Sequence, residues 1–317
     1  MGTLFGRGRK RNAPMSWSVV VSSPKGEAGA QWGDTWFATD LVDALKRAGE
    51  KAKVVYRNAA TSEARESDDV VIVLRGLRRV VPRRGNALWL LWIISHPELV
   101  ESDEPAQYDA VFAASAHWHR GASSEFGVPI APMLQATNQR RFNPDAAAPD
   151  TGEPVLFVGS TRGEFRPAVR DALAGGIDVS IYGVGWEAFL PPESIAGEFL
   201  DNDQLPAAYA SAGVVLNDHW PDMAAEGFLS NRLFDAAACG SRVLSDPATG
   251  LDEVFASTVR TYSSADELVG VLRTYRDEAF ASRAQRLELA EHIAREHSFD
   301  ARAAVLIERA RELRAAR

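Results

Sequence analysis

Residues 155–166 read VLFVGSTRGEFR, an apolar run followed by glycines and arginines. Gly159 and Gly163 permit close approach of the backbone to a ligand, and Arg162 and Arg166 carry guanidinium groups that bind phosphate oxygens through paired hydrogen bonds. Backbone N–H groups at the start of a following helix would face the same anion. The stretch is neither a Walker A loop nor a G-x-G-x-x-G fingerprint. It predicts a diphosphate site, and a structural turn with surface arginines is the alternative.

A second polar stretch, residues 226–246, reads EGFLSNRLFDAAACGSRVLSD. Asn231 and Asp235 are four residues apart and share one face of an expected helix, to which Arg232 is adjacent. The loop with Glu226 precedes this helix, whose N-terminus can hold a phosphate. Glu226 and Asp235 could then reach sugar or ribose hydroxyls. The alternative is a buried helix with a local Arg232–Asp235 ion pair.

Metal and thiol chemistry are not favoured. Cys239 is the only cysteine, so neither an intrachain disulfide nor a cysteine metal cluster can form. Asp218 and His219 have no second histidine at ligand spacing, and His117 and His119 point to different sides of an expected helix. We therefore expect no bound metal and no cofactor.

His96 follows the apolar run ALWLLWII and precedes Pro97, which disfavours a helical conformation at His96. An imidazole at the end of a strand can act as an acid, a base or a hydrogen-bond donor. The alternative is a histidine that only caps a buried strand.

The elements around these residues alternate between strands and helices. The expected strands are apolar runs within 18–23, 53–57, 68–76, 87–98, 108–115, 128–135, 155–160, 178–183, 213–218, 241–246 and 259–264. The expected helices cover 35–49, a stretch from 116, 165–174, a stretch ending near 212, the helix of 226–246, and 265–317 with a break at 297–300. Strands that are apolar throughout predict parallel sheets covered on both faces, an α/β class.

In such sheets ligands bind beyond the carboxyl ends of the strands. This rule selects polar loops in both halves of the chain: Gly26–Asp34, Arg75–Gly76, Ser95–Pro97, Ser115, Gly159–Arg162, Gly183–Trp186, Asn217–Trp220 and Ser245–Asp246.

The length of 317 residues suits about two domains. We expect a flexible basic tail over 1–15, a Rossmann-like domain over 16–145, a second one over 146–296 after the linker NPDAAAPDTGEP, and a C-terminal helix over 297–317. The tail is read as disordered or as an over-extended start, with weak contact to anionic lipid at the inner face of a membrane as the alternative.

Composition excludes several classes. The net charge of −8 gives no basic footprint for nucleic acid. The longest apolar run has eight residues, far short of the ~20 that a membrane span needs. A single cysteine fits a reducing compartment, so we expect a cytoplasmic protein.

Several stretches together resemble a known family. LFDAAACGSRVLSDPATGLDEVF is similar to the donor-site signature of GT-B glycosyltransferases. With VLFVGSTRG, LPAAYASAGVVLNDHW, DMAAEGFLSNRLFD and HSFDARAAVLIERA it resembles the CgeB-like (spore-maturation-type) branch of the glycosyltransferase group 1 superfamily. WGDTWFATDLVDALKRAG, WIISHPE and YDAVFAAS look like the N-terminal half of that branch.

The resemblance implies a GT-B fold, in which two Rossmann-like doubly wound parallel-sheet domains face a central cleft. The C-terminal domain would hold a nucleotide-diphosphate sugar and the N-terminal domain the acceptor, without an essential metal. The last helix would pack back on the N-terminal domain. Many members carry two glutamates separated by seven residues. In this chain Asp235 stands in the second place, and Glu226 is one position off the first.

We therefore expect transfer of a sugar to a hydroxyl of a glycan, lipid-linked or small-molecule acceptor, as in cell-envelope polysaccharide synthesis. The expected catalytic residues are His96, Asp34, Glu226 and Asp235. The expected donor-binding residues are Gly159, Ser160, Arg162, Arg166, Gly183, Asn217, Asp218, His219, Asn231, Arg232, Asp246 and Glu253, and the acceptor-side residues are Trp32, Gly33 and Ser95. An epimerase or phosphorylase of the same fold, or a non-catalytic sugar-nucleotide-binding scaffold, are the alternatives.

Overall fold

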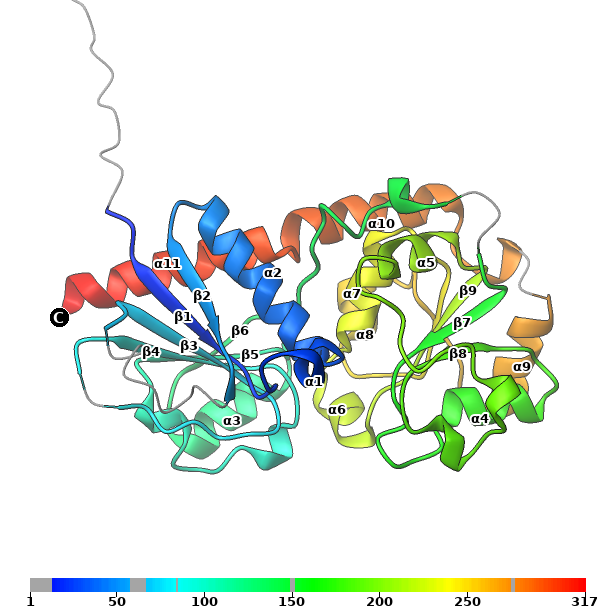
Figure 1. The fold of residues 1–317 in the computed structure, drawn as a ribbon, viewed down its shortest axis with the longest axis horizontal. Coiled ribbons are helices and arrows are strands. Elements are labelled where there is room, and N and C mark those ends of the chain that lie inside the picture. Colours follow the sequence, from blue (N-terminus) through cyan, green and yellow to red (C-terminus); the bar gives the residue numbers. More distant parts are fainter. Residues whose placement is uncertain (1–12, 58–66, 84, 149–151, 275–276) are drawn as a thin grey trace, which may run out of the picture.

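The computed structural model describes residues 13–57, 67–83, 85–148, 152–274 and 277–317 (Figure 1). The chain forms two α/β domains that lie side by side, each around its own parallel sheet. The predicted fold class is thereby confirmed.

The first sheet has six strands in the order β2-β1-β3-β4-β5-β6. Its strands are β1 (Ser16–Val20), β2 (Lys51–Val55), β3 (Val70–Arg75), β4 (Leu88–Ile93), β5 (Ala110–Ala113) and β6 (Ile130–Pro132). β3 and β4 are buried along their whole length, because helices and loops cover both faces of the sheet. Their continuous apolar sequence is the signal by which they are recognised.

The second sheet has the order β11-β10-β9-β7-β8, again with parallel neighbours. Its strands are β7 (Val155–Val158), β8 (Ser180–Tyr182), β9 (Val214–Asn217), β10 (Val243–Ser245) and β11 (Arg260–Thr261). After β7, the chain places β8 on one side of it and β9 on the other, so the strand order reverses between β7 and β9. The loops that follow these two strands therefore open into one crevice.

The helices lie between and around the strands. They are α1 (Glu27–Ala30), α2 (Gly33–Arg47), α3 (Trp118–Phe126), α4 (Pro167–Ala174), α5 (Leu205–Ser211), α6 (Pro221–Glu226), α7 (Asn231–Ala238), α8 (Leu251–Phe255), α9 (Ala265–Thr274), α10 (Arg283–Glu296) and α11 (Phe299–Ala316). Short 3₁₀ turns are η3 (Pro97–Leu99), η4 (Pro105–Gln107), η5 (Pro144–Ala146), η6 (Trp186–Ala188), η7 (Pro192–Ser194) and η8 (Asp277–Ala279). No described helix is long and apolar enough to cross a membrane.

Two helix boundaries differ from the sequence expectation. The polar stretch before α7 contains a separate short helix, α6, which ends at Gly227 with a left-handed φ of 72°. The C-terminal tail breaks once more than expected, since α10 begins after Ser282, whose hydroxyl and Gln285 form a capping box. The expected break at 297–300 is present, and the Ser298 hydroxyl caps α11.

The last helix belongs to the core of the first domain. α10 runs along the second domain, and α11 continues past it to lie against α2 (Figure 1). Phe299, Leu306 and Ile307 of α11 are buried in the same cluster as Leu41 of α2. The chain therefore crosses between domains twice, and both crossings meet where Thr137 N donates to the carbonyl of residue 297 and Phe299 N donates to the Thr137 carbonyl.

The domains also touch through α6. Met223 and Phe228, which flank the end of α6, are buried in a core cluster of the first domain. Trp118 of α3 meets Phe228 edge to face, with ring centroids 5.6 Å apart. This contact packs α6 of the second half of the chain against the first domain.

Candidate functional site

A cavity of about 320 Å³ lies between the domains, in the size range of small-molecule sites. One wall is α2, and the other is made by the loops after β7 and β8, α5 and the start of α7. Eight of the sequence-predicted site residues line it: Gly33, Gly159, Ser160, Arg162, Gly183, Asn231, Arg232 and Asp235.

Arg232 lines the cavity from the second domain, and the buried Arg166 lies near it without being one of the described lining residues. Arg166 is paired with Asp218, with Nε 3.0 Å from Oδ2 and the terminal nitrogen on Oδ1. Arg232 Nε donates to the Val158 carbonyl at 3.0 Å, and its Nη1 donates to Asn217 Oδ1 at 3.1 Å. Both guanidinium groups are fixed by the strand ends of β7 and β9.

Arg162 completes an arginine triad with Arg166 and Arg232 but has a different environment. Its side chain is accessible in the cleft and lies over the Trp220 ring, 5.5 Å from the centroid. Among the described residues, no hydrogen bond or ion pair holds its guanidinium. Partial desolvation of the guanidinium by the surrounding protein, followed by the like charges of Arg166 and Arg232, lowers the pKa of Arg162 to about 10.

The triad carries more positive charge than its surroundings compensate. Asp218 pairs with Arg166 and lies 3.9 Å from Arg232, while Arg162 receives only longer-range stabilisation from Asp218 and Asp34. Unbalanced cations at the edge of a partly desolvated cleft favour binding of an anion. A diphosphate supplies the charge and the oxygens that guanidinium groups bind best.

Glycines bring the loops after β7 and β8 close together. A Cβ on Gly183, whose φ is +147°, would sit 2.3 Å from the Gly159 carbonyl oxygen. A Cβ on Gly159 would sit 2.6 Å from an Arg232 guanidinium nitrogen. Glycine is thus needed at both positions for the close packing of this wall.

Two predicted site residues adopt left-handed backbone conformations. Arg162 has φ 58° and His96 has φ 54°; among the described non-glycine residues only Ala256 and Ser257 share this region. Such conformations cost about 1–3 kcal/mol and gather at functional sites, where the surrounding structure maintains them.

Asp34, at the start of α2, faces the arginine triad across the cleft. Burial raises the pKa of Asp34, and the charges of Arg162 and His96 partly oppose that rise. A Cβ on Gly76 would meet both Ser95 Oγ and Asp34 Oδ2 within 3.6 Å, which places these two side chains at one spot. The acceptor-side candidates Asp34, His96 and Ser95 therefore lie together in the first domain.

Two further carboxylates enclose the cavity. Asp235 Oδ1 accepts from the Thr137 hydroxyl at 2.7 Å, and its Oδ2 accepts from Asn231 at 2.8 Å. Asp40 Oδ1 accepts from Asn138 at 2.7 Å. Burial raises the pKa of Asp235 to about 8 and also raises that of Asp40. Near neutral pH the Asp235 carboxyl therefore holds its proton more readily than an exposed one.

Four of the predicted residues that do not line this cavity have partners elsewhere. Glu226 is exposed on another groove, where its backbone carbonyl accepts from Ser115 Oγ at 2.6 Å, and exposed Glu253 is 3.2 Å from His117 Nε2. Both face the first domain instead of the donor crevice. His219 and Asp246 bond to each other behind the cavity wall. These four do not touch the cavity because domain contacts and burial occupy them.

The cavity also contains residues that the sequence did not single out. Trp36 and Asp40 of α2, Tyr182 at the end of β8 and Tyr209 of α5 all line it. Trp36 and Asp40 are four residues apart on the face of α2 that includes Gly33. This spacing of Trp36 and Asp40 is the signal that the sequence offers. The face of α2 becomes a cavity wall only because the second domain lies opposite it.

Trp32 is half-buried just before α2, where its ring lies 5.9 Å from the Arg57 guanidinium carbon. Among the described residues it does not line the cavity, although its neighbour Gly33 does.

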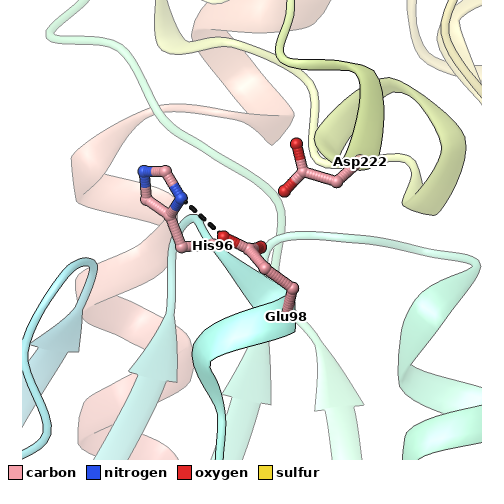
Figure 2. A group of neighbouring side chains, drawn as sticks. All are labelled: His96, Glu98 and Asp222. Atoms are coloured by element: carbon pink, nitrogen blue, oxygen red, sulfur yellow. Dashed lines mark hydrogen bonds and ion pairs between the residues drawn. The ribbon is translucent and has the colours of Figure 1, made fainter. Parts of the chain in front are cut away.

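One group of side chains has the composition of a metal site. His96, Glu98 and Asp222 each offer a ligand atom, and these atoms lie within 4.8 Å of one another. Figure 2 shows the His96 ring bonded to Glu98, at 2.9 Å from Nδ1 to Oε1, with Asp222 facing the pair from α6. The group could hold a divalent cation, and it joins both domains.

Comparisons with known proteins agree with this geometry. The family described as "Glycosyl transferase-like" matches residues 162–308. AviGT4, a glycosyltransferase involved in avilamycin A biosynthesis, is 17% identical, with 96% of this chain and 99% of that chain covered and a TM-score of 0.62. A glycosyltransferase from Rickettsia africae is 12% identical, with 95% and 98% covered and a TM-score of 0.68. No curated protein matches the sequence.

The fold is GT-B. A third similar structure is Anabaena HepE in complex with UDP-glucose, at 11% identity, with 93% of this chain and 99% of that chain covered and a TM-score of 0.63. The similarity to these structures shows the fold, and the matched family covers less than half of the chain. The matched residues include Arg162, Arg166 and the whole of α7.

Proposed function

We propose that this GT-B protein transfers a sugar from a nucleotide-diphosphate sugar to a hydroxyl of an acceptor. The observation that carries the proposal is the arginine triad, in which Arg162 lines the cavity and forms no ion pair with any described residue. Breaking the anomeric C–O bond leaves negative charge on the β-phosphate. Prearranged cations that face this charge stabilise the transition state most when water is partly excluded.

The nucleoside would occupy the cavity itself. Val184 and Phe199, two large apolar side chains that are 41% and 39% exposed, both line it and offer a surface on which a base can stack. Asp235 and Asn231 would hold ribose hydroxyls, since Asn231 Oδ1 has no hydrogen-bond partner among the described residues. The diphosphate then lies beside Gly159 and the arginine triad.

The acceptor would approach from the first domain. Asp34 is our candidate base, because its raised pKa makes its carboxylate a stronger proton acceptor than an exposed aspartate. His96 and Ser95 would orient the acceptor hydroxyl. The bond from the sugar to the β-phosphate oxygen breaks, the bond to the acceptor oxygen forms, and the acceptor proton passes to Asp34.

We further propose that transfer needs no metal, since the triad provides the positive charge that a cation would otherwise supply. The order of the sequence stretches supports the CgeB-like branch and a glycan, lipid-linked or small-molecule acceptor, with cell-envelope polysaccharide as one such class. A cytoplasmic location with peripheral membrane contact is consistent with these acceptors.

The test is binding of UDP-, GDP-, dTDP-, ADP- and CMP-sugars, measured by thermal shift with and without Mg²⁺. A ligand at a hundred times its Kd adds about 2.7 kcal/mol to folded stability. One nucleotide series that stabilises the protein equally with and without metal, and releases its nucleoside diphosphate only with acceptor, supports the proposal. Turnover without acceptor would indicate an epimerase, and dependence on inorganic phosphate a phosphorylase. Binding of no sugar nucleotide at millimolar concentration would overturn it.

A further inference from the structure

A chain of buried polar side chains lies behind the arginine triad. These hydrogen bonds join the carboxyl ends of β9 and β10 to Ser230, the residue that precedes α7. The side chains that take part are Asn217, His219, Ser230, Ser245 and Asp246. The His219 side chain is fully buried. A histidine in this position cannot touch the donor, although the ring of the next residue, Trp220, lies under Arg162.

His219 makes two hydrogen bonds whose directions are fixed. Ser230 N–H can only donate, so His219 Nε2, 3.1 Å away, must accept and carries no hydrogen. Nδ1 therefore bears the proton and donates to Asp246 Oδ1 at 2.7 Å. Asp246 Oδ2 accepts from the His219 backbone N–H at 2.9 Å, which holds the carboxylate in place. The structure thus requires one neutral tautomer of His219.

The same bonds reach the arginine triad through one atom. Ser230 is the N-cap residue of α7, and its hydroxyl donates to Asn217 Oδ1 at 2.6 Å. Asn217 Oδ1 also accepts from Arg232 Nη1 at 3.1 Å, while Asn217 Nδ2 donates to Ser245 Oγ at 2.9 Å. A displacement of Ser230 would therefore disturb the acceptor that orients Arg232.

We propose that His219, fixed as its Nδ1–H tautomer by Asp246, is a positioning residue that holds the start of α7 and Arg232 in the donor-binding arrangement. This inference rests on the proposed function, because the donor diphosphate is the ligand whose binding it governs. A residue that was only part of the core would be replaceable by any side chain that restores folding. His219 should be replaceable only by one that restores an acceptor toward Ser230.

Two amide substitutions separate these possibilities. The carbonyl of His219→Gln reaches the position of Nε2 and can accept from Ser230 N–H, whereas the shorter His219→Asn replaces only the Nδ1 side. Leaving a buried N–H without an acceptor costs about 1–3 kcal/mol, or about 5- to 150-fold in an equilibrium constant. His292→Asn on α10, whose imidazole bonds Arg295, is a matched control away from the cavity.

The donor is first identified with the wild-type protein by the nucleotide panel, and Kd is then measured by calorimetry. We expect His219→Gln to bind within about threefold of wild type and His219→Asn to bind about tenfold or more weakly, in line with the cost of a lost acceptor. His292→Asn should match wild type. Failure of the wild-type protein to bind any sugar nucleotide would contradict the proposed function. A wild type that binds, with His219→Gln and His219→Asn equally strong or equally weak, would overturn this inference alone.

A spectroscopic measurement decides the matter if the variants fold poorly. Nitrogen chemical shifts of the imidazole in the wild-type protein report which ring nitrogen carries hydrogen. We expect His219 as the Nδ1–H tautomer at neutral pH, in both the free and the nucleotide-bound protein. A proton on Nε2 would leave nothing to accept from Ser230 and would refute the inference.

Discussion

Replacement of Arg162 by glutamine should weaken donor binding without weakening the fold. Among the described residues, Arg162 has no side-chain hydrogen bond or ion pair, and its guanidinium lies over the Trp220 ring. The charges of Arg166 and Arg232, together with burial, oppose its protonated form. Arg162→Gln removes this repulsion, so we expect the free energy of unfolding to stay constant or rise slightly.

The expected loss in affinity follows from the bond that is removed. A hydrogen bond to a charged group contributes about 1.5–3 kcal/mol, which corresponds to about 10- to 150-fold in Kd. Arg166→Gln should behave in the opposite way, because it leaves the buried Asp218 carboxylate without its partner. Breaking a buried pair from one side costs about 3–5 kcal/mol of folding free energy.

The assay combines urea denaturation with calorimetric titration of the donor identified by the nucleotide panel. Arg170→Gln is the matched control, since this exposed arginine on α4 pairs only with its neighbour Asp171. It should change neither affinity nor stability by more than about 0.5 kcal/mol. Unchanged donor affinity in Arg162→Gln, or a loss of stability as large as that of Arg166→Gln, would refute the assignment of Arg162 to the phosphate.

Three other predictions test the fold and the chemistry. The raised pKa of Asp235, about 8 against an ordinary 3.8, means that the folded chain keeps a proton that the unfolded chain releases, so the contribution of this group to stability should fall between pH 4 and 8. Asp235→Asn should remove that contribution in urea denaturation at pH 5 and pH 8, and a difference between the two pH values identical to that of the wild type would contradict the shift. Leu306→Ala should lower the unfolding free energy by about 2–5 kcal/mol, because Leu306 of α11 is buried in the first domain, whereas the exposed Val305→Ala should change it by less than about 0.5 kcal/mol. EDTA should leave donor binding and transfer unchanged, and a loss that Mn²⁺ restores would instead assign a metal to the His96 group.

Much of the fold could be predicted because its signals are local. β3 and β4 are apolar over their whole length, and this pattern occurs where both faces of a strand are covered. Gly49 ends the first long helix region with a φ of 95°, as a glycine after a helix commonly does. The break before α10 was missed although Ser282 and Gln285 carry the capping-box pattern. The break was hard to recognise because the sequence has a helical pattern both before it, in α9, and after it, in α10.

The site was predictable only in part, because strand ends can be located from sequence but the partners of a loop cannot. Arg162 and Arg232 are far apart in the chain and meet because β7 and β9 are neighbours in the sheet. Glu226 ends α6 and Glu253 lies in α8, both beyond strand ends, yet contacts with Ser115 and His117 turn them toward the first domain. Nothing in the local sequence distinguishes a loop that faces a ligand from one that faces another domain.

The cavity depends on a single short segment as much as on the two sheets. Thr137 bonds Asp235 of the second domain, and the next residue, Asn138, bonds Asp40 of the first. Two consecutive residues of the crossing chain therefore hold carboxyls on opposite walls, and Thr137 also pairs with the returning chain at Ser298. Any rotation of one domain against the other must move Asp40 and Asp235 about this point. The two hydrogen bonds therefore tie both walls to the crossing segment, which links the geometry of the cavity to the positions of Thr137 and Asn138.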